Sequence, residues 1–151
     1  MTPAFEFLMR LEADVGEPSS MGVGPLGERR IVPINGGSFA GPRIRGDILP
    51  GGNDWQIVRA DGVIELDARY ALREQRGGSI RVVSQGYRHG APEVLAAIAR
   101  GEDVEPARYY FRTAMRFETG APGLAWLNGM LAVACAERKA RRVLIDAYLI
   151  L

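Results

Sequence analysis

Apolar residues recur at every second position in several short stretches of the chain, and this spacing is typical of β-strands with one buried face. In residues 64–72 the apolar side chains occupy the even positions, while charged side chains and one alanine occupy the odd positions. Residues 5–12 and 110–118 alternate in a similar way. The strands predicted from these patterns lie roughly at 5–12, 28–35, 37–49, 54–59, 62–73, 79–86, 110–118, 124–137 and 141–151.

Turn signals separate these strands, and one segment has a different period. Asp-Gly at 61–62 and Gly-Gly at 77–78 suit hairpin turns between neighbouring strands. Between Pro92 and Arg100 the apolar residues fall at helical spacing, and Gly101 suits the end of a helix. Closure of the sheet is favoured because an open sheet of this length would expose its edges. We predict an all-β fold, a closed or nearly closed antiparallel barrel of calycin or lipocalin size, with one short α-helix near 92–100.

The composition restricts the function classes without choosing one. A chain of 151 residues predicts a single domain, 1–151. The net charge of +1 gives no basic surface for nucleic acid. His89 is the only histidine and the acids are not clustered, so we expect no metal and no cofactor. Charges among residues 1–14 and the lack of an apolar run of ~20 residues favour a cytoplasmic protein without a membrane partner.

Three further patterns resemble functional motifs, but their context argues against them. Residues 22–27 match the letters of the dinucleotide fingerprint, yet neither a strand before them nor a helix after them is predicted. Residues 36–40 approach the nucleophile elbow of serine hydrolases but end in Ala40 instead of glycine. The charged run 137–142 is interpreted as a solvated hairpin tip, with an anion site as the alternative.

Several phrases of the sequence together resemble a bacterial and fungal family known as domain of unknown function 3237. The more specific ones are Pro-Gly-Gly-Asn-Asp-Trp at 50–55 and Asp-Ala-Arg-Tyr at 67–70, and further phrases occur at 30–39, 110–112, 117–119 and 126–128. The resemblance covers nearly the whole chain and implies a β-barrel of this size, with no established activity. The large aromatic residues inside these phrases, Trp55, Tyr70 and Trp126, are expected to line one pocket.

The polar positions of the strands supply the candidate site. We expect Arg69, Glu118 and Asn128 to face the interior, because aromatic neighbours flank them as in a mixed pocket wall. A buried Arg69 requires a carboxylate, and Glu118 and Asp54 are the candidates. Adjacent strand residues point to opposite faces, so Tyr70 can join Arg69 only at a bulge.

Two more residues complete the set of candidate ligand-binding residues. Arg112 shares the polar face of its strand with Glu118. His89 precedes the predicted helix, where we expect a loop residue, with a role at the pocket rim as the alternative.

Three functions fit such a barrel, and whether it is an enzyme is left open. The first is metal-free and nucleotide-free acid/base chemistry of isomerase, lyase or cyclase type on an apolar or aromatic oxygenated metabolite. Glu118 or Asp54 would be the general acid/base, and Arg69 would stabilise an oxyanion or hold a carboxylate. The second is a carrier that binds a small molecule without chemistry, and the third is a structural protein with a filled lumen. A homodimer is expected because barrels often pair through an outer face.

Overall fold

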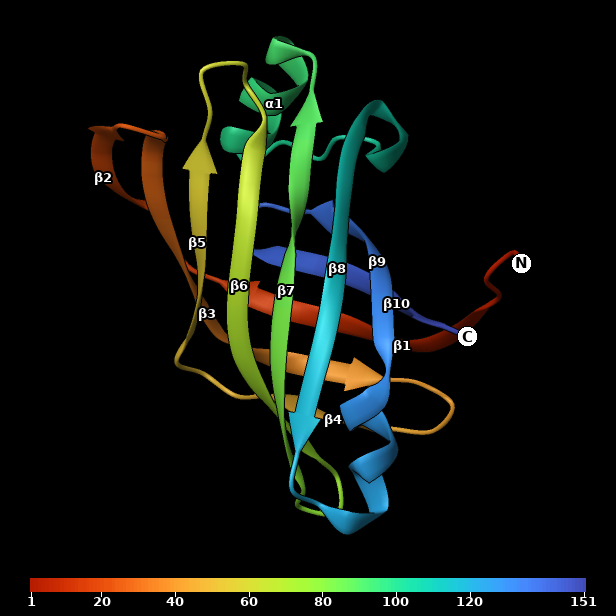
Figure 1. Cartoon of the computed structure of the whole chain (residues 1–151). Coiled ribbons are helices and arrows are strands. Elements are labelled where there is room, and N and C mark those ends of the chain that lie inside the picture. Colours follow the sequence, from red (N-terminus) through yellow and green to blue (C-terminus); the bar gives the residue numbers. More distant parts are fainter.

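Ten strands carry most of the chain in the computed structural model, which describes residues 1–151 (Figure 1). The predicted alternation therefore produces the expected strands, several of them longer than predicted, whereas a strand at 19–24 was not predicted. The strands are β1 (Phe5–Val15), β2 (Ser19–Gly24), β3 (Gly27–Ala40), β4 (Arg45–Ile48), β5 (Gly52–Val58), β6 (Ile64–Glu74), β7 (Ser79–Gly90), β8 (Tyr109–Thr119), β9 (Leu131–Arg138) and β10 (Arg142–Ile150).

The sheet closes on itself because β1 pairs with β10 on one side and with β3 on the other. Every pairing is antiparallel, in the order β1-β10-β9-β8-β7-β6 and then back to β3. Between β6 and β3 one place is shared by β4 and β5, each pairing with both strands over a different part of their length. The ring thus has eight places. β2 pairs with the first part of β3, which β1 does not reach. The predicted closed antiparallel barrel is confirmed.

Two predicted strands differ from the observed ones. The segment 37–49 is interrupted, because β3 ends at Ala40 and β4 begins only at Arg45. The segment 124–137 begins as the 3-10 helix η2 (Pro122–Gly129), and β9 starts at Leu131. Leu124 and Leu127 lie three residues apart, so a 3-10 turn places both on one side, where they are buried in the barrel core.

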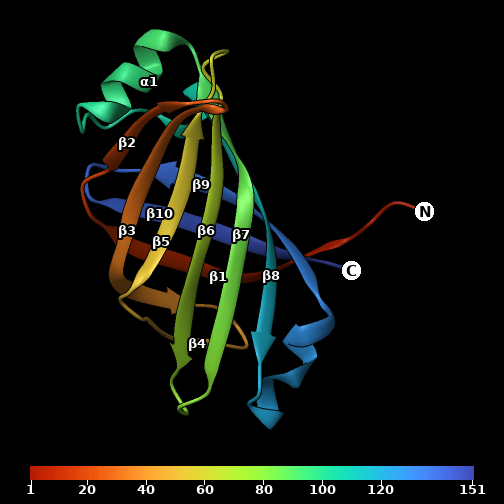
Figure 2. The ribbon, with the colours of Figure 1, turned by 60° about the vertical axis from the view of Figure 1, so that its left-hand side comes forward.

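Helical segments lie at both ends of the barrel (Figure 2). At one end η2 contributes to a core cluster of 22 buried residues that fills the lower interior. At the other end lies α1 (Pro92–Ala99), the predicted helix, followed by η1 (Pro106–Arg108). Val94 and Ile98 of α1 pack into a second cluster of eight buried residues. No helix combines the length and the apolar character needed to cross a membrane.

A buried polar cavity as candidate functional site

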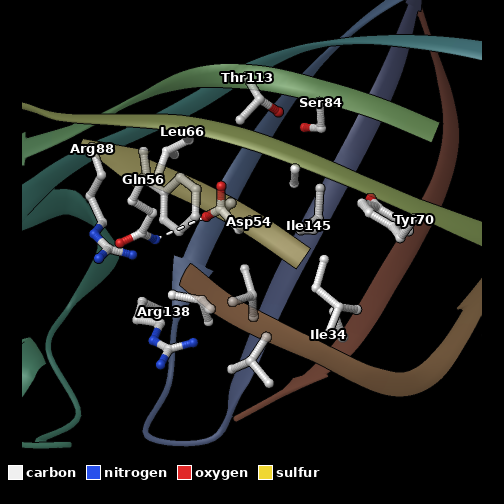
Figure 3. A pocket seen from close by; sticks show the side chains of 17 residues that line it. Ile34, Asp54, Gln56, Leu66, Tyr70, Ser84, Arg88, Thr113, Arg138 and Ile145 are labelled. Atoms are coloured by element: carbon white, nitrogen blue, oxygen red, sulfur yellow. Dashed lines mark hydrogen bonds between the residues drawn. The ribbon is translucent and has the colours of Figure 1, made fainter. Parts of the chain in front are cut away.

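A cavity of about 60 Å³ remains inside the barrel where the two apolar clusters meet (Figure 3). Seventeen side chains line it, and eleven of them are hydrophobic. In Figure 3, Arg88, Gln56 and Arg138 lie towards one end, Asp54 lies in the middle and Tyr70 lies at the other end. The cavity is therefore an apolar chamber with a few converging polar groups, which is the usual character of a small-molecule site.

Asp54 is the only carboxylate in the cavity wall, and two neutral donors hold it in place. Its Oδ2 accepts a hydrogen bond of 2.9 Å from Nε2 of Gln56, and its Oδ1 accepts one of 2.9 Å from the backbone N–H of Asp67. Asp54 and Gln56 are two residues apart on β5, so both side chains point to the interior face of the strand. Arg30 fixes the amide of Gln56, because Nη2 of Arg30 donates to Oε1 of Gln56 at 2.8 Å.

Burial raises the pKa of Asp54 above its ordinary value. The hydrogen bonds from Gln56 and Asp67 and the positive charge of Arg88 act in the opposite direction, but desolvation is the larger effect. Since both oxygens already accept a hydrogen bond, a proton on Asp54 must occupy one of the remaining lone pairs. Asp54 lines the cavity, so this carboxyl group can give a proton to a bound molecule or take one from it.

Two arginines point into the same chamber without a protein counterion. Arg88 is only 7% exposed, its Nε has no hydrogen-bond partner, and its guanidinium lies 5.3 Å from the ring centre of Phe111. Burial lowers the pKa of Arg88 to about 10, and the charges of Arg138 and Arg30 act in the same direction. Burial also lowers the pKa of Arg138. The site is thus a cationic one, in which Asp54 acts on both arginines through space and Glu17 acts on Arg138, with no direct ion pair.

Two further polar groups of the cavity have unused hydrogen-bonding capacity: Tyr70 lies at the end away from the arginines (Figure 3), and Thr113 lies beside Gly86, nearer to Arg88. The hydroxyl of Tyr70 and Oγ1 of Thr113 are buried and have no partner, and Ser84 lines the wall between their strands. A buried hydroxyl without a partner costs about 1–3 kcal/mol. These hydroxyls are available to a ligand that carries an oxygen or nitrogen function.

The cavity adjoins a larger outer hollow of about 760 Å³ between the first half of β3, α1 and the β9–β10 hairpin, here called the vestibule. Four residues line both spaces and therefore form the boundary between them, here called the passage: Val32, Gln56, Arg88 and Arg138. The acids of the vestibule are Glu17, Glu28 and Asp61, and none forms an ion pair with Arg88 or Arg138.

Of the nine residues predicted from the sequence, the structure places Asp54 and Tyr70 in the cavity. The expectation that Arg69 and Glu118 face the interior is wrong. Both side chains lie on the outer face, where Arg69 is 57% exposed and pairs with Asp67 at 3.7 Å, and where Glu118 sits opposite Arg81. The physical reason is the regular pleat: inward Tyr70 and Phe117 force their neighbours outward.

Three other predicted residues also lie outside the cavity, on the barrel surface. Trp55 follows Asp54 on β5, points outward and is 44% exposed. Arg112 and His89 are exposed and flank Tyr110: the ring of His89 stacks on it at 4.7 Å, and the guanidinium of Arg112 lies 5.4 Å away. His89 and Arg112 point outward because the residues before them on β7 and β8, Arg88 and Phe111, point into the barrel.

Trp126 and Asn128 have structural roles in η2 and do not reach the cavity. The Trp126 ring packs against the larger core cluster under the guanidinium of Arg43, at 3.7 Å. Asn128 is bonded to the backbone of Thr119: its Oδ1 accepts from the N–H at 2.8 Å and its Nδ2 donates to the carbonyl at 3.0 Å. The predicted pocket of Trp55, Tyr70 and Trp126 is therefore wrong except for Tyr70.

Sequence reasoning missed the residues that surround Asp54 in the cavity. Arg88 continues the inward phase of Ile80, Val82 and Ser84 on β7, and Arg138 continues the phase of the alanines of β9. On each strand every second residue is small or apolar until an arginine near the end of the strand, and this pattern could have predicted an inward arginine. The interpretation of the run 137–142 as a solvated hairpin tip is therefore wrong for Arg138, which lines the cavity and the vestibule.

Comparison with known proteins assigns this barrel to a family. The chain matches the family model described as "Protein of unknown function (DUF3237)" over residues 3–150, and it belongs to that family. It is 43% identical to the UPF0311 protein RPA1785 of Rhodopseudomonas palustris, with both chains covered completely. The crystal structure of RPA1785 superposes with a TM-score of 0.94, covering 100% of this chain and 99% of that one. The predicted resemblance is confirmed.

Other relatives extend the fold to further organisms. A protein of Acinetobacter baumannii described as β-barrel like is 40% identical and superposes with a TM-score of 0.88, covering 100% of this chain and 98% of that one. A structure described as an enzyme from Penicillium herquei is 21% identical with a TM-score of 0.76, covering 100% and 96%, and this likeness shows the fold alone. The PR-toxin biosynthesis cluster protein 7 of Penicillium roqueforti is 23% identical over 145 residues, covering 83% of this chain and 78% of that one.

Proposed function

We propose that this protein is an enzyme that binds a small oxygenated metabolite in the barrel cavity and uses Asp54 as general acid and base. The observation that carries the proposal is a single carboxyl group, buried in an apolar chamber, oriented by two donors and open to the cavity. The expected reaction class is isomerase, lyase or cyclase chemistry. One fungal protein similar in fold is described as an enzyme, and one similar in sequence is described as a biosynthesis cluster protein, which supports a catalytic role.

The pKa of Asp54 suits this role. A carboxyl group with a raised pKa is a weaker acid and its anion a stronger base, so proton transfer in either direction is easier near neutral pH. A protonated Asp54 gives its proton to an oxygen or carbon of the ligand, and the resulting carboxylate takes a proton from a second position. Donor and acceptor are then restored, as an isomerisation or ring closure requires.

The hydroxyls of Tyr70 and Thr113 supply the positioning. Both are buried and without partners, so a ligand oxygen that accepts from them satisfies groups that are otherwise unpaired. That gain is made only when the ligand enters fully, which holds the reacting atoms close to Asp54.

The test is proton exchange with solvent. The purified chain and its Asp54→Asn variant are incubated in D₂O with a panel of aromatic ketones, phenols and keto acids, and deuterium incorporation into C–H bonds is followed by NMR. We expect at least one compound to exchange faster with the native chain and to fall to the uncatalysed rate with Asp54→Asn. If the variant matches the native chain for every compound that is accelerated, Asp54 is not the acid/base.

A non-catalytic carrier is the second candidate, because most of the cavity wall is hydrophobic. In that case Asp54→Asn changes the affinity for a ligand, while no compound of the panel exchanges faster with the native chain than in buffer.

A further inference from the structure

The two arginines at the passage lack the partners that a buried cation requires. Neither Arg88 nor Arg138 makes a side-chain hydrogen bond or ion pair within the protein. Of Arg138, only the backbone N–H is bonded to a side chain: it donates to the hydroxyl of Tyr109 at 2.9 Å. Arg88 is buried and Arg138 is half-buried, and an unpaired charge removed from water is unfavourable, so the two arginines are suited to an anion from outside.

The nearby acid does not neutralise the pair. The carboxylate of Asp54 has no ion pair with Arg88, and its oxygens are already used by Gln56 and the backbone of Asp67. Arg30 adds a third positive charge next to Gln56. Three arginines, Arg30, Arg88 and Arg138, therefore face two nearby acids, Asp54 and Glu17, so the positive charge is in excess even when Asp54 is ionised.

We propose that the ligand is an organic carboxylate whose carboxylate group binds between Arg88 and Arg138 and whose apolar body enters the cavity. This inference rests on the proposed function, because it names the substrate class of the same site. Planar guanidinium groups match a carboxylate with paired hydrogen bonds. The wall beyond the passage is mainly hydrophobic, which suits a carbon skeleton attached to that carboxylate and does not suit a free inorganic anion.

The size of the cavity limits the body of the ligand. At roughly 10–15 Å³ for each water-sized position, a volume of about 60 Å³ holds about four to six non-hydrogen atoms, as in one ring or a short branched chain. An oxygen on the far side of that body reaches the end of the cavity where Tyr70 has a free hydroxyl, and the free hydroxyl of Thr113 lies nearer to the arginines. The ligand class is therefore a small oxygenated carboxylic acid, with larger substituents accommodated only in the vestibule.

The binding test compares benzoate, its neutral isostere benzamide, and inorganic phosphate by isothermal titration calorimetry with the whole purified chain. We expect benzoate to bind and both benzamide and phosphate to bind at least about tenfold more weakly. Binding of benzamide as tight as benzoate, binding of phosphate as tight as benzoate, or no binding of benzoate overturns the proposal.

Variants assign the binding to the passage. Arg88→Met and Arg138→Met each weaken benzoate binding at least about tenfold, whereas Arg141→Met, which removes an exposed charge from the vestibule wall, leaves it unchanged. Two passage variants are used so that one still decides if the other fails to fold, as judged by circular dichroism. An equal loss with Arg141→Met would mean diffuse attraction by surface charge and would overturn the assignment.

The two proposals fail in different ways. Asp54→Asn retains benzoate binding if Asp54 acts in chemistry and Arg88 and Arg138 act in recognition. If benzoate does not bind but Asp54→Asn still abolishes exchange with a neutral compound of the panel, the anionic substrate class is wrong and the acid/base function stands.

Discussion

The side-chain amide of Gln56 donates a 2.9 Å hydrogen bond to the carboxylate of Asp54, two positions earlier on the same strand. Arg30 determines the direction of this bond, because it donates to Oε1 of Gln56 and leaves the NH₂ group towards Asp54. The relationship makes Gln56 a positioning residue: it holds the carboxyl group in one orientation and partly offsets the effect of burial on its pKa.

Gln56→Leu is expected to raise the pKa of Asp54 further, because it removes a hydrogen bond that favours the ionised form. The measurement is the pH dependence of the exchange reaction catalysed by the native chain and the variant. With Asp54 acting first as acid, activity falls as pH rises through its pKa, so the falling limb should move to higher pH in Gln56→Leu. A limb that stays in place or moves to lower pH would contradict this role of Gln56.

Asp54→Asn is expected to change how stability depends on pH. Because the folded pKa of Asp54 is raised, the folded chain binds more protons than the unfolded chain between the ordinary value, about 3.9, and the raised one. The native chain therefore loses stability as pH increases through that window, by about 1.4 kcal/mol for each unit of difference in pKa. Asparagine does not titrate, so the variant lacks this loss.

Denaturant unfolding of both proteins between pH 4 and 8 measures the effect. The free energy of unfolding of Asp54→Asn relative to the native chain should increase with pH. A difference that is constant with pH, or that decreases, would show that Asp54 is not shifted upward.

Tyr70→Phe is expected to leave stability unchanged or to increase it by up to about 1 kcal/mol, since the hydroxyl that is removed is buried without a partner. Tyr109→Phe is the matched control. Its hydroxyl accepts a hydrogen bond from the backbone of Arg138, so its loss should destabilise the fold by about 1 kcal/mol. Thermal unfolding of the two variants distinguishes a hydroxyl kept for a ligand from one kept for the fold, and a larger loss with Tyr70→Phe would reverse that assignment.

Gly37→Ala is expected to destabilise the barrel by about 2–4 kcal/mol at the seam between β3 and β1. Gly37 has φ = +133°, and an added Cβ would lie 2.0 Å from the carbonyl oxygen of Glu12 on the partner strand. Gly120→Ala is the control, because nothing lies within 4 Å of the added atom, and it should change stability by less than about 0.5 kcal/mol. Equal melting temperatures for both variants would mean that closure at this seam does not need glycine.

The alternation along β6 and β8 predicted both the barrel and the faces of its strands. On β6 the even residues are inward and Arg69 is outward, as the period of two requires. The placement of Arg69 and Glu118 in the interior came from a second argument, that aromatic neighbours indicate a pocket, and the pleat overrules it because adjacent residues face opposite sides. Asp54 and Tyr70 were found, since both lie in the distinctive phrases of the sequence and in the inward phase.

The remaining residues of the site depend on relations between strands that one sequence does not reveal. Arg88 and Arg138 come together because β7 and β9 are second neighbours around the ring, on either side of β8. The vestibule lies where β3 pairs with β2 and no longer with β1, next to the β9–β10 hairpin and α1. Strand order and the placement of a short helix decide both features, and periodicity within a strand carries no information about either.

Asp54 and the two unpaired arginines are proposed to form one ligand site, and a ¹³C NMR titration of the Asp54 carboxyl carbon is the sharpest test of this proposal. The resonance is assigned by its loss in Asp54→Asn, and its pKa is measured with and without saturating benzoate. We predict a pKa above the ordinary value in the free protein and a further increase with benzoate, because a bound anion disfavours the carboxylate. A pKa at or below about 3.9 that does not respond to benzoate would contradict the account.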